Sequence, residues 1–456
     1  MNRPTLGRVG LVSLGCPKNL VDSEEMLGAL AEAGWSIVAD QNDADVIVVN
    51  TCGFIESAKQ ESIDTILEMV ALKKPGGCKS VVVTGCLAQR YAAELQAEMP
   101  DIDAIVGVGQ ARALPGILAL TLSGQRVVDT SPPSRLWVEV EERIKATSPW
   151  TAYLKISDGC DNRCSYCAIP DIRGGFRSRP LQNVIAEAQR LAAEGVLEIN
   201  LVGQDVTRYG EDSGEASLVT LLRELVKIEG PKWFRLLYCY PTRIMSDLID
   251  LVATEPKITK YMDIPFQHGD DRTLARMNRK GSSEDYLRLV KEIRSASPDI
   301  ALRTSIIVGF PGETKDEFGR LVDFINEIKF DRVGVFQYSL EEGTPAAEMP
   351  GQVSERTRKS RYARLMETQQ AISREKNLAL IGRELDVLVE CAGDEATPAY
   401  GRSHRDAPDI DGVVFLEGFC GQAGDFVRAR ITDAAEYDLT ATVITDLDNT
   451  DKQEVV

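Results

Sequence analysis

The chain has 456 residues, and its 70 Asp and Glu against 52 Lys and Arg give a formal net charge of −18. Ten cysteines in a chain of this length exclude a small, disulfide-rich secreted domain. The apolar runs are far too short to span a membrane, and the first residues do not resemble a secretory signal. We therefore expect a cytoplasmic protein of about three domains with no membrane contact.

In residues 1–125, an apolar run that ends in a small residue and then a cysteine occurs three times, at Cys16, Cys52 and Cys86. A helical pattern follows each run, at 22–33, 57–72 and 87–99. Apolar strands that alternate with helices predict a doubly wound parallel sheet, in which all strands end at the same edge. The three cysteines should therefore converge and form a metal-cluster site. The alternative is that each is a small buried apolar residue, as we expect for Cys78, Cys239, Cys391 and Cys420.

Residues 126–150 contain Ser-Pro turn signals and are predicted to be a linker. From 151 to 353, about six strand-then-helix units follow, which predict a partial (β/α)6 TIM-like barrel with its chemistry at the C-terminal ends of the strands. The predicted strands lie near 153–156, 198–202, 234–239, 261–264, 302–308 and 332–338.

Residues 354–376 predict a charged helical connector, and residues 377–456 predict a small antiparallel β-barrel of short alternating runs and Gly-rich turns. Its predicted strands include 385–390, 413–416, 425–431 and 440–444. Residues 377–456 hold 17 Asp and Glu against 6 Lys and Arg. An acidic barrel repels a phosphate backbone and favours a basic partner.

A second group of thiols, Cys160, Cys164 and Cys167, lies in one loop just past the first predicted barrel strand. A closed tetrahedral zinc site needs a fourth ligand, and the only two histidines, His268 and His404, are far away in sequence. Three thiolates suit an iron–sulfur cluster with one iron left open for a small molecule. A structural zinc with a distant fourth ligand, or reduced and inert thiols, are the alternatives.

This Cys-x-x-x-Cys-x-x-Cys loop resembles the motif of radical S-adenosylmethionine (SAM) enzymes. With four further stretches, the chain resembles the radical SAM methylthiotransferases over nearly its whole length. The resemblance implies a cluster-binding domain, a radical SAM barrel and a C-terminal TRAM barrel. It also implies two 4Fe-4S clusters, one on each cysteine group, and SAM as both radical source and methyl donor. The loop lies within 159–170, and the four further stretches are 173–179, 263–268, 307–314 and 401–408.

Five residues are predicted to shape the SAM pocket. Tyr166 holds the position that, by the resemblance, lies against the adenine, although it could simply pack the loop. Gly203 and Gln204 end the second barrel strand and either receive the methionine amine or form a turn. Arg303 is a charged residue in a predicted interior strand and could pair with the methionine carboxylate. Gly309 begins a turn whose backbone could approach the adenosine.

Within the family, the chain most resembles the branch that methylthiolates the β-carbon of an aspartate in small-subunit ribosomal protein number twelve. A basic ribosomal protein, free or in the small subunit, suits the acidic barrel, and residues 406–412 either contact it or form a solvated loop. An electron-donor protein is a further expected partner, whereas the acidic barrel disfavours RNA. The alternatives are a methylthiotransferase that modifies an adenosine of tRNA and a non-catalytic iron–sulfur adaptor.

Overall fold

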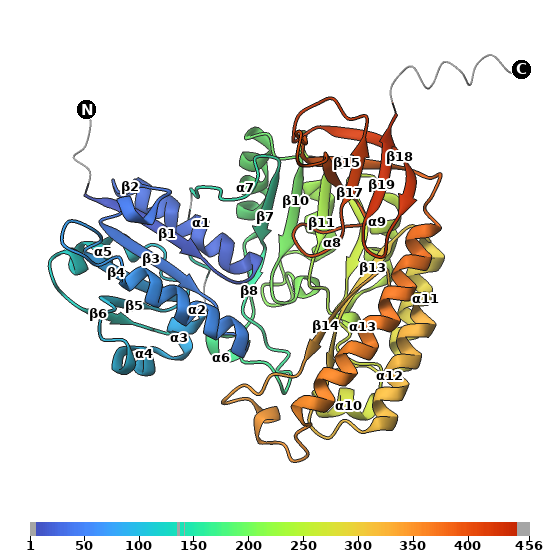
Figure 1. The fold of residues 1–456 in the computed structure, drawn as a ribbon, viewed down its shortest axis with the longest axis horizontal. Coiled ribbons are helices and arrows are strands. Elements are labelled where there is room, and N and C mark those ends of the chain that lie inside the picture. Colours follow the sequence, from blue (N-terminus) through green and yellow to red (C-terminus); the bar gives the residue numbers. More distant parts are fainter. Residues whose placement is uncertain (1–5, 135–136, 141, 445–456) are drawn as a thin grey trace, which may run out of the picture.

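The computed structural model describes residues 6–134, 137–140 and 142–444, and Figure 1 shows their arrangement. The predicted segments 1–125, 126–150 and 377–456 each include residues outside this described part. Three main sheets follow one another along the chain, and a long helix joins the second to the third (Figure 1).

The N-terminal domain is a parallel sheet with the strand order β2-β1-β3-β4-β5-β6. Its strands are β1 (Arg8–Ser13), β2 (Ser36–Ile37), β3 (Val46–Thr51), β4 (Ser80–Gly85), β5 (Ala104–Val106) and β6 (Val127–Asp129). Alternate residues of β3 and β4 pack into two cores on opposite faces of the sheet. Both strands are fully buried because helices cover both faces. Helices α1 (Pro17–Glu32) and α5 (Leu114–Leu122) cover one face, and α2 (Glu56–Val70), α3 (Cys86–Arg90) and α4 (Ala92–Glu98) cover the other. The predicted doubly wound sheet is confirmed.

Two boundaries in this domain differ from the sequence prediction. Strand β6 pairs with β5, so the first sheet extends into residues predicted to be linker. These three residues are too short a run to show an apolar period. The helix predicted at 87–99 is divided into α3 and α4 at Tyr91, whose backbone leaves the helical region at φ −126° and ψ 33°.

The second domain is a six-stranded parallel sheet with the order β14-β13-β12-β11-β10-β7. The first and last strands do not pair within the described residues, so the barrel is partial, as predicted. The strands are β7 (Thr151–Lys155), β10 (Glu198–Val202), β11 (Trp233–Leu236), β12 (Ile258–Asp263), β13 (Ala301–Val308) and β14 (Arg332–Gln337). Around them lie α7 (Leu181–Ala193), α8 (Leu218–Leu225), α9 (Ser246–Thr254), α11 (Ser283–Ala296) and α12 (Lys315–Ile328).

Short elements follow two of the barrel strands at their C-terminal ends. After β7, the pair β8 (Ser157–Asp158) and β9 (Arg177–Ser178) encloses a loop and α6 (Ile169–Arg173). After β12 comes α10 (Asp271–Arg276). These elements form part of the barrel mouth, which faces the N-terminal domain.

Helix α13 (Glu355–Leu378) leads to a closed five-stranded barrel. Its strands are β15 (Glu384–Cys391), β16 (Tyr400–Ser403), β17 (Val414–Glu417), β18 (Phe426–Ala434) and β19 (Leu439–Val443). The predicted small barrel is confirmed, and its strand pairs are antiparallel except for β17 and β19, which are parallel. Strand β16 was not predicted, since its sequence has no apolar alternation. In this domain Cys420 is exposed and Cys391 is only partly buried, rather than buried as expected.

The C-terminal barrel also contributes to the second domain. The loop after β16 packs against the N-terminal ends of the barrel strands, where Arg402 pairs with Glu198 at 2.6 Å and Asp406 pairs with Arg332 at 2.6 Å. Asp411 accepts a hydrogen bond of 2.6 Å from the Tyr261 hydroxyl. The predicted contact surface at 406–412 is therefore wrong: Asp406 is 1% exposed, and most of this stretch fills the bottom of the barrel. In the described ranges, no helix is long and apolar enough to cross a membrane.

Candidate active site

The loop that carries Cys160, Cys164 and Cys167 lies at the C-terminal end of the first barrel strand, where the sequence predicted it. Gly159 opens this loop with φ +74°, and a Cβ atom there would lie 2.1 Å from the carbonyl oxygen of Gly175. Only glycine permits this approach of the two backbones. The thiol loop is therefore fixed against the segment that follows α6.

Hydrogen bonds hold the thiol loop from two other sides. Asn162 donates to the Asp205 carboxylate at 2.9 Å, and Arg243 donates to Asn162 Oδ1 at 2.9 Å. On the opposite side, the Ser165 hydroxyl donates to the carbonyl of Arg276 at 2.7 Å. These hydrogen bonds tie the thiol loop to the ends of neighbouring barrel strands.

The thiols of this loop are close enough to influence one another. Burial raises the pKa of Cys160 to about 11, and the neighbouring Cys164 adds to this shift. Burial also raises the pKa of Cys167, with contributions from Cys164 and Cys160. Among residues 6–134, 137–140 and 142–444, no three His, Cys, Asp or Glu side chains are placed to hold one metal ion. Three thiols without a histidine are a donor set that suits an iron–sulfur cluster with one iron left open.

The second thiol group lies at the C-terminal edge of the first sheet, as predicted. Cys16 directly precedes α1, Cys52 follows β3, and Cys86 begins α3 directly after β4. Gly15 has φ +89°, and a Cβ atom there would lie 2.8 Å from Cys52 Cβ. The absence of a side chain at Gly15 lets the strand ends that carry Cys16 and Cys52 approach each other.

The thiols of this second group influence one another's pKa values. Burial raises the pKa of Cys86 to about 12, and Cys16 and Cys52 also raise it. Burial and Cys16 raise the pKa of Cys52. Burial also acts to raise the pKa of Cys16, but the cations Lys18 and Arg173 outweigh it and the net shift is downward. The donor set is again three thiols.

The two thiol groups face each other across the domain boundary. Cys86 packs against Ala168 and Ile172 of the barrel domain, and Ala168 directly follows Cys167. Arg173, at the end of α6, is 1% exposed. Its guanidinium pairs with Asp22 of α1 at 2.7 Å and with Asp158 at 3.2 Å.

Three arginines follow the thiol loop, and all three bind acidic groups of the protein. Arg177 pairs with Asp158 at 3.0 Å, and Arg179 pairs with Glu187 and Glu139.

Two predicted pocket residues lie in or beside the thiol loop, and their roles in binding SAM stay predictions. The Tyr166 ring packs edge-on against Phe310, with ring centroids 6.4 Å apart, within an apolar group that includes Tyr338. Gln204 donates through its amide nitrogen to Asp158 at 3.0 Å, while its oxygen is buried and has no hydrogen-bond partner in the described structure. A buried acceptor without a donor fits the ammonium of a bound ligand.

The other three predicted pocket residues have local partners. A Cβ atom on Gly203 would lie 2.3 Å from Ser157 Oγ, which explains the glycine by packing. Arg303 pairs with Asp263 at 2.9 Å and with Asp411 at 3.4 Å, so its buried charge needs no ligand. The Gly309 amide donates to Glu313 at 2.8 Å. The cofactor roles of these residues stay predictions.

Sequence reasoning missed three side chains near the thiols. The Arg279 Nη1 atom lies 3.8 Å from Cys164 Sγ. The guanidinium carbon of Arg279 lies 4.1 Å from the centroid of the Tyr240 ring. Lys18 lies over the Tyr238 ring, 3.2 Å from its centroid. The position of Lys18, two residues after Cys16, was the available signal, since a cation stabilises a nearby thiolate. Nothing local marks Arg279 or Tyr238, which reach the site only through the fold.

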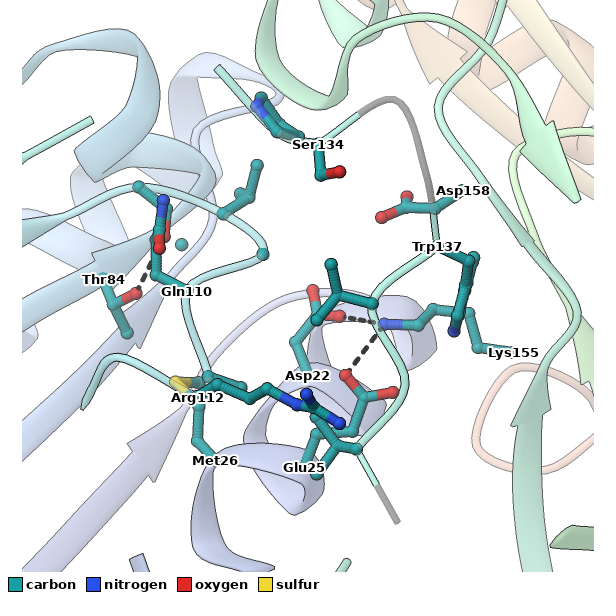
Figure 2. A pocket seen from close by; sticks show the side chains of 18 of the residues that line it. Asp22, Glu25, Met26, Thr84, Gln110, Arg112, Ser134, Trp137, Lys155 and Asp158 are labelled. Carbon is teal, nitrogen blue, oxygen red and sulfur yellow. Dashed lines mark hydrogen bonds and ion pairs between the residues drawn. The ribbon is translucent and has the colours of Figure 1, made fainter. Parts of the chain in front are cut away.

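A cavity lies beside α1, between the edge of the first sheet and the segment before β7 (Figure 2). Lys155 projects into it and bonds to Asp22 and Glu25 of α1, as the dashed lines in Figure 2 mark. Trp137 lies over Lys155, with 5.6 Å between the ammonium and the ring centroid. The cavity lining includes no cysteine, so its ion pairs join the domains but do not form part of either thiol site.

Comparison with known proteins agrees with this architecture. Residues 154–325 match the radical SAM superfamily, and residues 381–444 match the TRAM domain. Residues 8–107 match a family described as uncharacterized protein family UPF0004. The fold and the site together define a radical SAM enzyme with a TRAM domain.

Two relatives narrow this class. The ribosomal protein uS12 methylthiotransferase RimO of Pelotomaculum thermopropionicum is 53% identical over 440 residues, which cover 96% of this chain and 99% of that protein. The protein of the same name from Geobacter sulfurreducens is 50% identical over 440 residues, covering 96% and 98%. The chain therefore belongs to the RimO family of radical SAM methylthiotransferases.

Among solved structures, the chain is similar to the radical S-adenosylmethionine methyltransferase TsrM from Kitasatospora setae. The TM-score is 0.56 at 19% identity, and the match covers 74% of this chain and 76% of that one. The cobalamin-dependent radical enzyme OxsB gives a TM-score of 0.52 at 16% identity, over 81% of this chain and 56% of that chain. These two structures share the fold.

Proposed function

We propose that this protein transfers a methylthio group to the β-carbon of an aspartate in ribosomal protein uS12. The observation that carries the proposal is the approach of two three-thiol groups at the mouth of a radical SAM barrel, where Cys86 packs against Ala168 next to Cys167. An adaptor with no catalytic role has no need of two such groups that face each other. Whole-length similarity to RimO proteins, which are named for uS12, favours the protein substrate over tRNA.

Each thiol group is assigned one 4Fe-4S cluster. Cys160, Cys164 and Cys167 would hold the first, and Cys16, Cys52 and Cys86 would hold the second. When bound, a cluster with an open iron and SAM supply the one-electron chemistry that removes hydrogen from an unactivated carbon, which no side-chain base can do. The clusters are expected to be reduced by a separate electron-donor protein.

The chain's own residues bind and orient the small molecule. The unpartnered Gln204 oxygen would accept from the methionine ammonium, and the Tyr166 ring would pack against the adenine. Packing of α6 against α3 buries Cys86 at the domain boundary, and a site shielded from water there would protect a reactive radical.

The acidic C-terminal barrel remains the proposed contact for basic uS12, although not through residues 406–412. Its exposed carboxylates lie on other strands and turns of the barrel. They include Asp394, Glu395, Glu417, Asp425 and Asp433. Charge complementarity at such positions speeds association and selects partners. We place the reaction in the cytoplasm, where a ribosomal protein is found.

Substrate competition tests this function. The enzyme is reconstituted with iron and sulfide without oxygen, then incubated with SAM, a reductant, uS12 and bulk tRNA in one vessel. Mass spectrometry should find the methylthio group on an aspartate of uS12 and no new methylthio group on tRNA. Modification of tRNA alone would replace this proposal with the tRNA alternative, and release of no 5′-deoxyadenosine would leave only the adaptor.

A further inference from the structure

Lys18 lies in an unusual environment for a lysine. It stands in the first turn of α1, two residues after Cys16, and is only 8% exposed. Its ammonium lies 3.2 Å from the centroid of the Tyr238 ring, at the end of β11 in the barrel domain. The side chain therefore crosses from the second thiol group to the mouth of the barrel.

The Lys18 ammonium has no carboxylate partner among the residues that the structure describes. The side chains that act most on its charge are Tyr238, Cys16 and Arg173. Nearby buried cations differ in this respect, because Lys155 binds Asp22 and Glu25. Burial of a charge is costly unless an opposite charge or hydrogen bonds compensate it. Beyond its neighbours Cys16 and Tyr238, the Lys18 ammonium can therefore bind one further anion.

The Tyr238 backbone fixes the aromatic partner of Lys18. Tyr238 has φ +64°, in the left-handed region that a residue with a bulky side chain rarely adopts. Its amide donates to Asp263 Oδ2 at 2.9 Å, and its carbonyl accepts from the Val206 amide at 3.2 Å. Such strained residues cluster at binding sites, where the surrounding structure holds them in place. The ring confines the Lys18 ammonium at the domain boundary.

We propose that the Lys18 ammonium binds the side-chain carboxylate of the target aspartate. This inference rests on the proposed function and adds a specificity-determining residue to it. The carboxylate is bonded directly to the β-carbon, so a cation that holds it fixes the reacting carbon one bond away. Lys18 reaches both the second thiol group and the barrel mouth, which places that carbon between the two. An adenosine of tRNA offers no anion on its base, so the same contact selects a protein substrate.

Peptide binding tests the proposal without turnover. Reconstituted holoenzyme with SAM but no reductant is titrated with a labelled peptide of the uS12 target loop, which carries either the aspartate or asparagine. Fluorescence anisotropy should show that the wild-type enzyme binds the asparagine peptide about tenfold more weakly, as expected for loss of one charge-assisted hydrogen bond. Lys18→Met should bind both peptides within about twofold of each other, and Lys18→Arg should restore most of the difference. Lys291→Met, an exposed lysine of α11, should behave as the wild type.

The possible results test the role of Lys18 independently of the proposed function. If Lys18→Met kept the tenfold preference with a full complement of iron, Lys18 would serve only to balance the nearby thiolates. Lys18→Gln, which keeps a polar side chain, gives the same comparison if the Met variant binds less iron. Equal and tight binding of both peptides by the wild type would overturn the role of Lys18 but leave uS12 as the substrate. Binding of neither peptide would overturn both.

Discussion

The guanidinium of Arg173 lies 2.7 Å from the carboxylate of Asp22, and this ion pair joins the barrel domain to α1 beside both thiol groups. Arg173 also pairs with Asp158, and its side chain is almost completely buried. Arg173 therefore helps to fix the relative position of the two candidate cluster sites.

Arg173→Met is expected to destabilise the protein by about 3 kcal/mol, because it leaves the part-buried carboxylates of Asp22 and Asp158 with one cation fewer. Urea unfolding followed by circular dichroism would measure the change. Arg190→Met, on an exposed position of α7, is the matched control and should shift stability by less than about 0.5 kcal/mol. Equal effects of the two substitutions would show that Arg173 does not hold the domains together.

Gly15→Ala should displace Cys52 and prevent assembly of the second cluster while the first cluster is retained. The new Cβ atom would lie 2.8 Å from Cys52 Cβ, at a φ of +89°. Gly34→Ala separates crowding from backbone strain, because Gly34 has φ +95° but no atom within 4 Å of its Cβ position. Iron analysis after reconstitution should show about half the wild-type content for Gly15→Ala and full content for Gly34→Ala. Full iron in both variants would contradict the placement of the second cluster.

The protein should lose stability in mild acid because of the buried His404 side chain. Burial, with Arg405 and Arg235 nearby, lowers the pKa of His404 to about 3. Between the unfolded value of about 6.5 and the folded value, the unfolded chain binds a proton that the folded chain does not, so stability falls as pH drops through this window. The contribution is about 1.4 kcal/mol for each pH unit below 6.5. His404→Gln should remove it, so the stability difference between variant and wild type should change with pH between 6.5 and 4.5 and stay constant above 7.5.

Asp406→Ala tests whether the C-terminal barrel closes the bottom of the radical SAM barrel. Asp406 binds Arg332 at 2.6 Å and the Ser403 hydroxyl at 3.0 Å, so its loss leaves a buried arginine without its carboxylate. We expect a loss of about 3 kcal/mol and faster proteolysis of the C-terminal domain. Asp433→Ala, at an exposed position of β18, should have little effect. Similar protease resistance of both variants would mean that the contacts of Asp406 do not hold the C-terminal barrel against the radical SAM barrel.

Much of the fold and both thiol groups could be predicted from local patterns. Strand β10 was predicted with its observed ends, because apolar runs and the helices after them have clear periods. The convergence of Cys16, Cys52 and Cys86 followed from the rule that parallel strands end at one edge. Neither prediction requires knowledge of distant partners.

The errors concern contacts between segments that are far apart in the chain. The acidic stretch 406–412 has the composition of a solvated loop, but arginines from two barrel strands, Arg332 and Arg303, pair with Asp406 and Asp411 in the interior. Arg303 was predicted to need a ligand because its partners, Asp263 and Asp411, could not be known from its own neighbours in sequence. Lys18 was overlooked because its burial depends on Tyr238, which belongs to another domain.

The most direct test of the whole account is an anaerobic assay of two triple variants with uS12, SAM and reductant. One variant replaces Cys160, Cys164 and Cys167 with alanine, and the other replaces Cys16, Cys52 and Cys86. We predict that the first produces neither 5′-deoxyadenosine nor modified uS12, whereas the second still produces 5′-deoxyadenosine but no methylthio-aspartate. Methylthiolated uS12 from either variant, measured by mass spectrometry, would contradict the account.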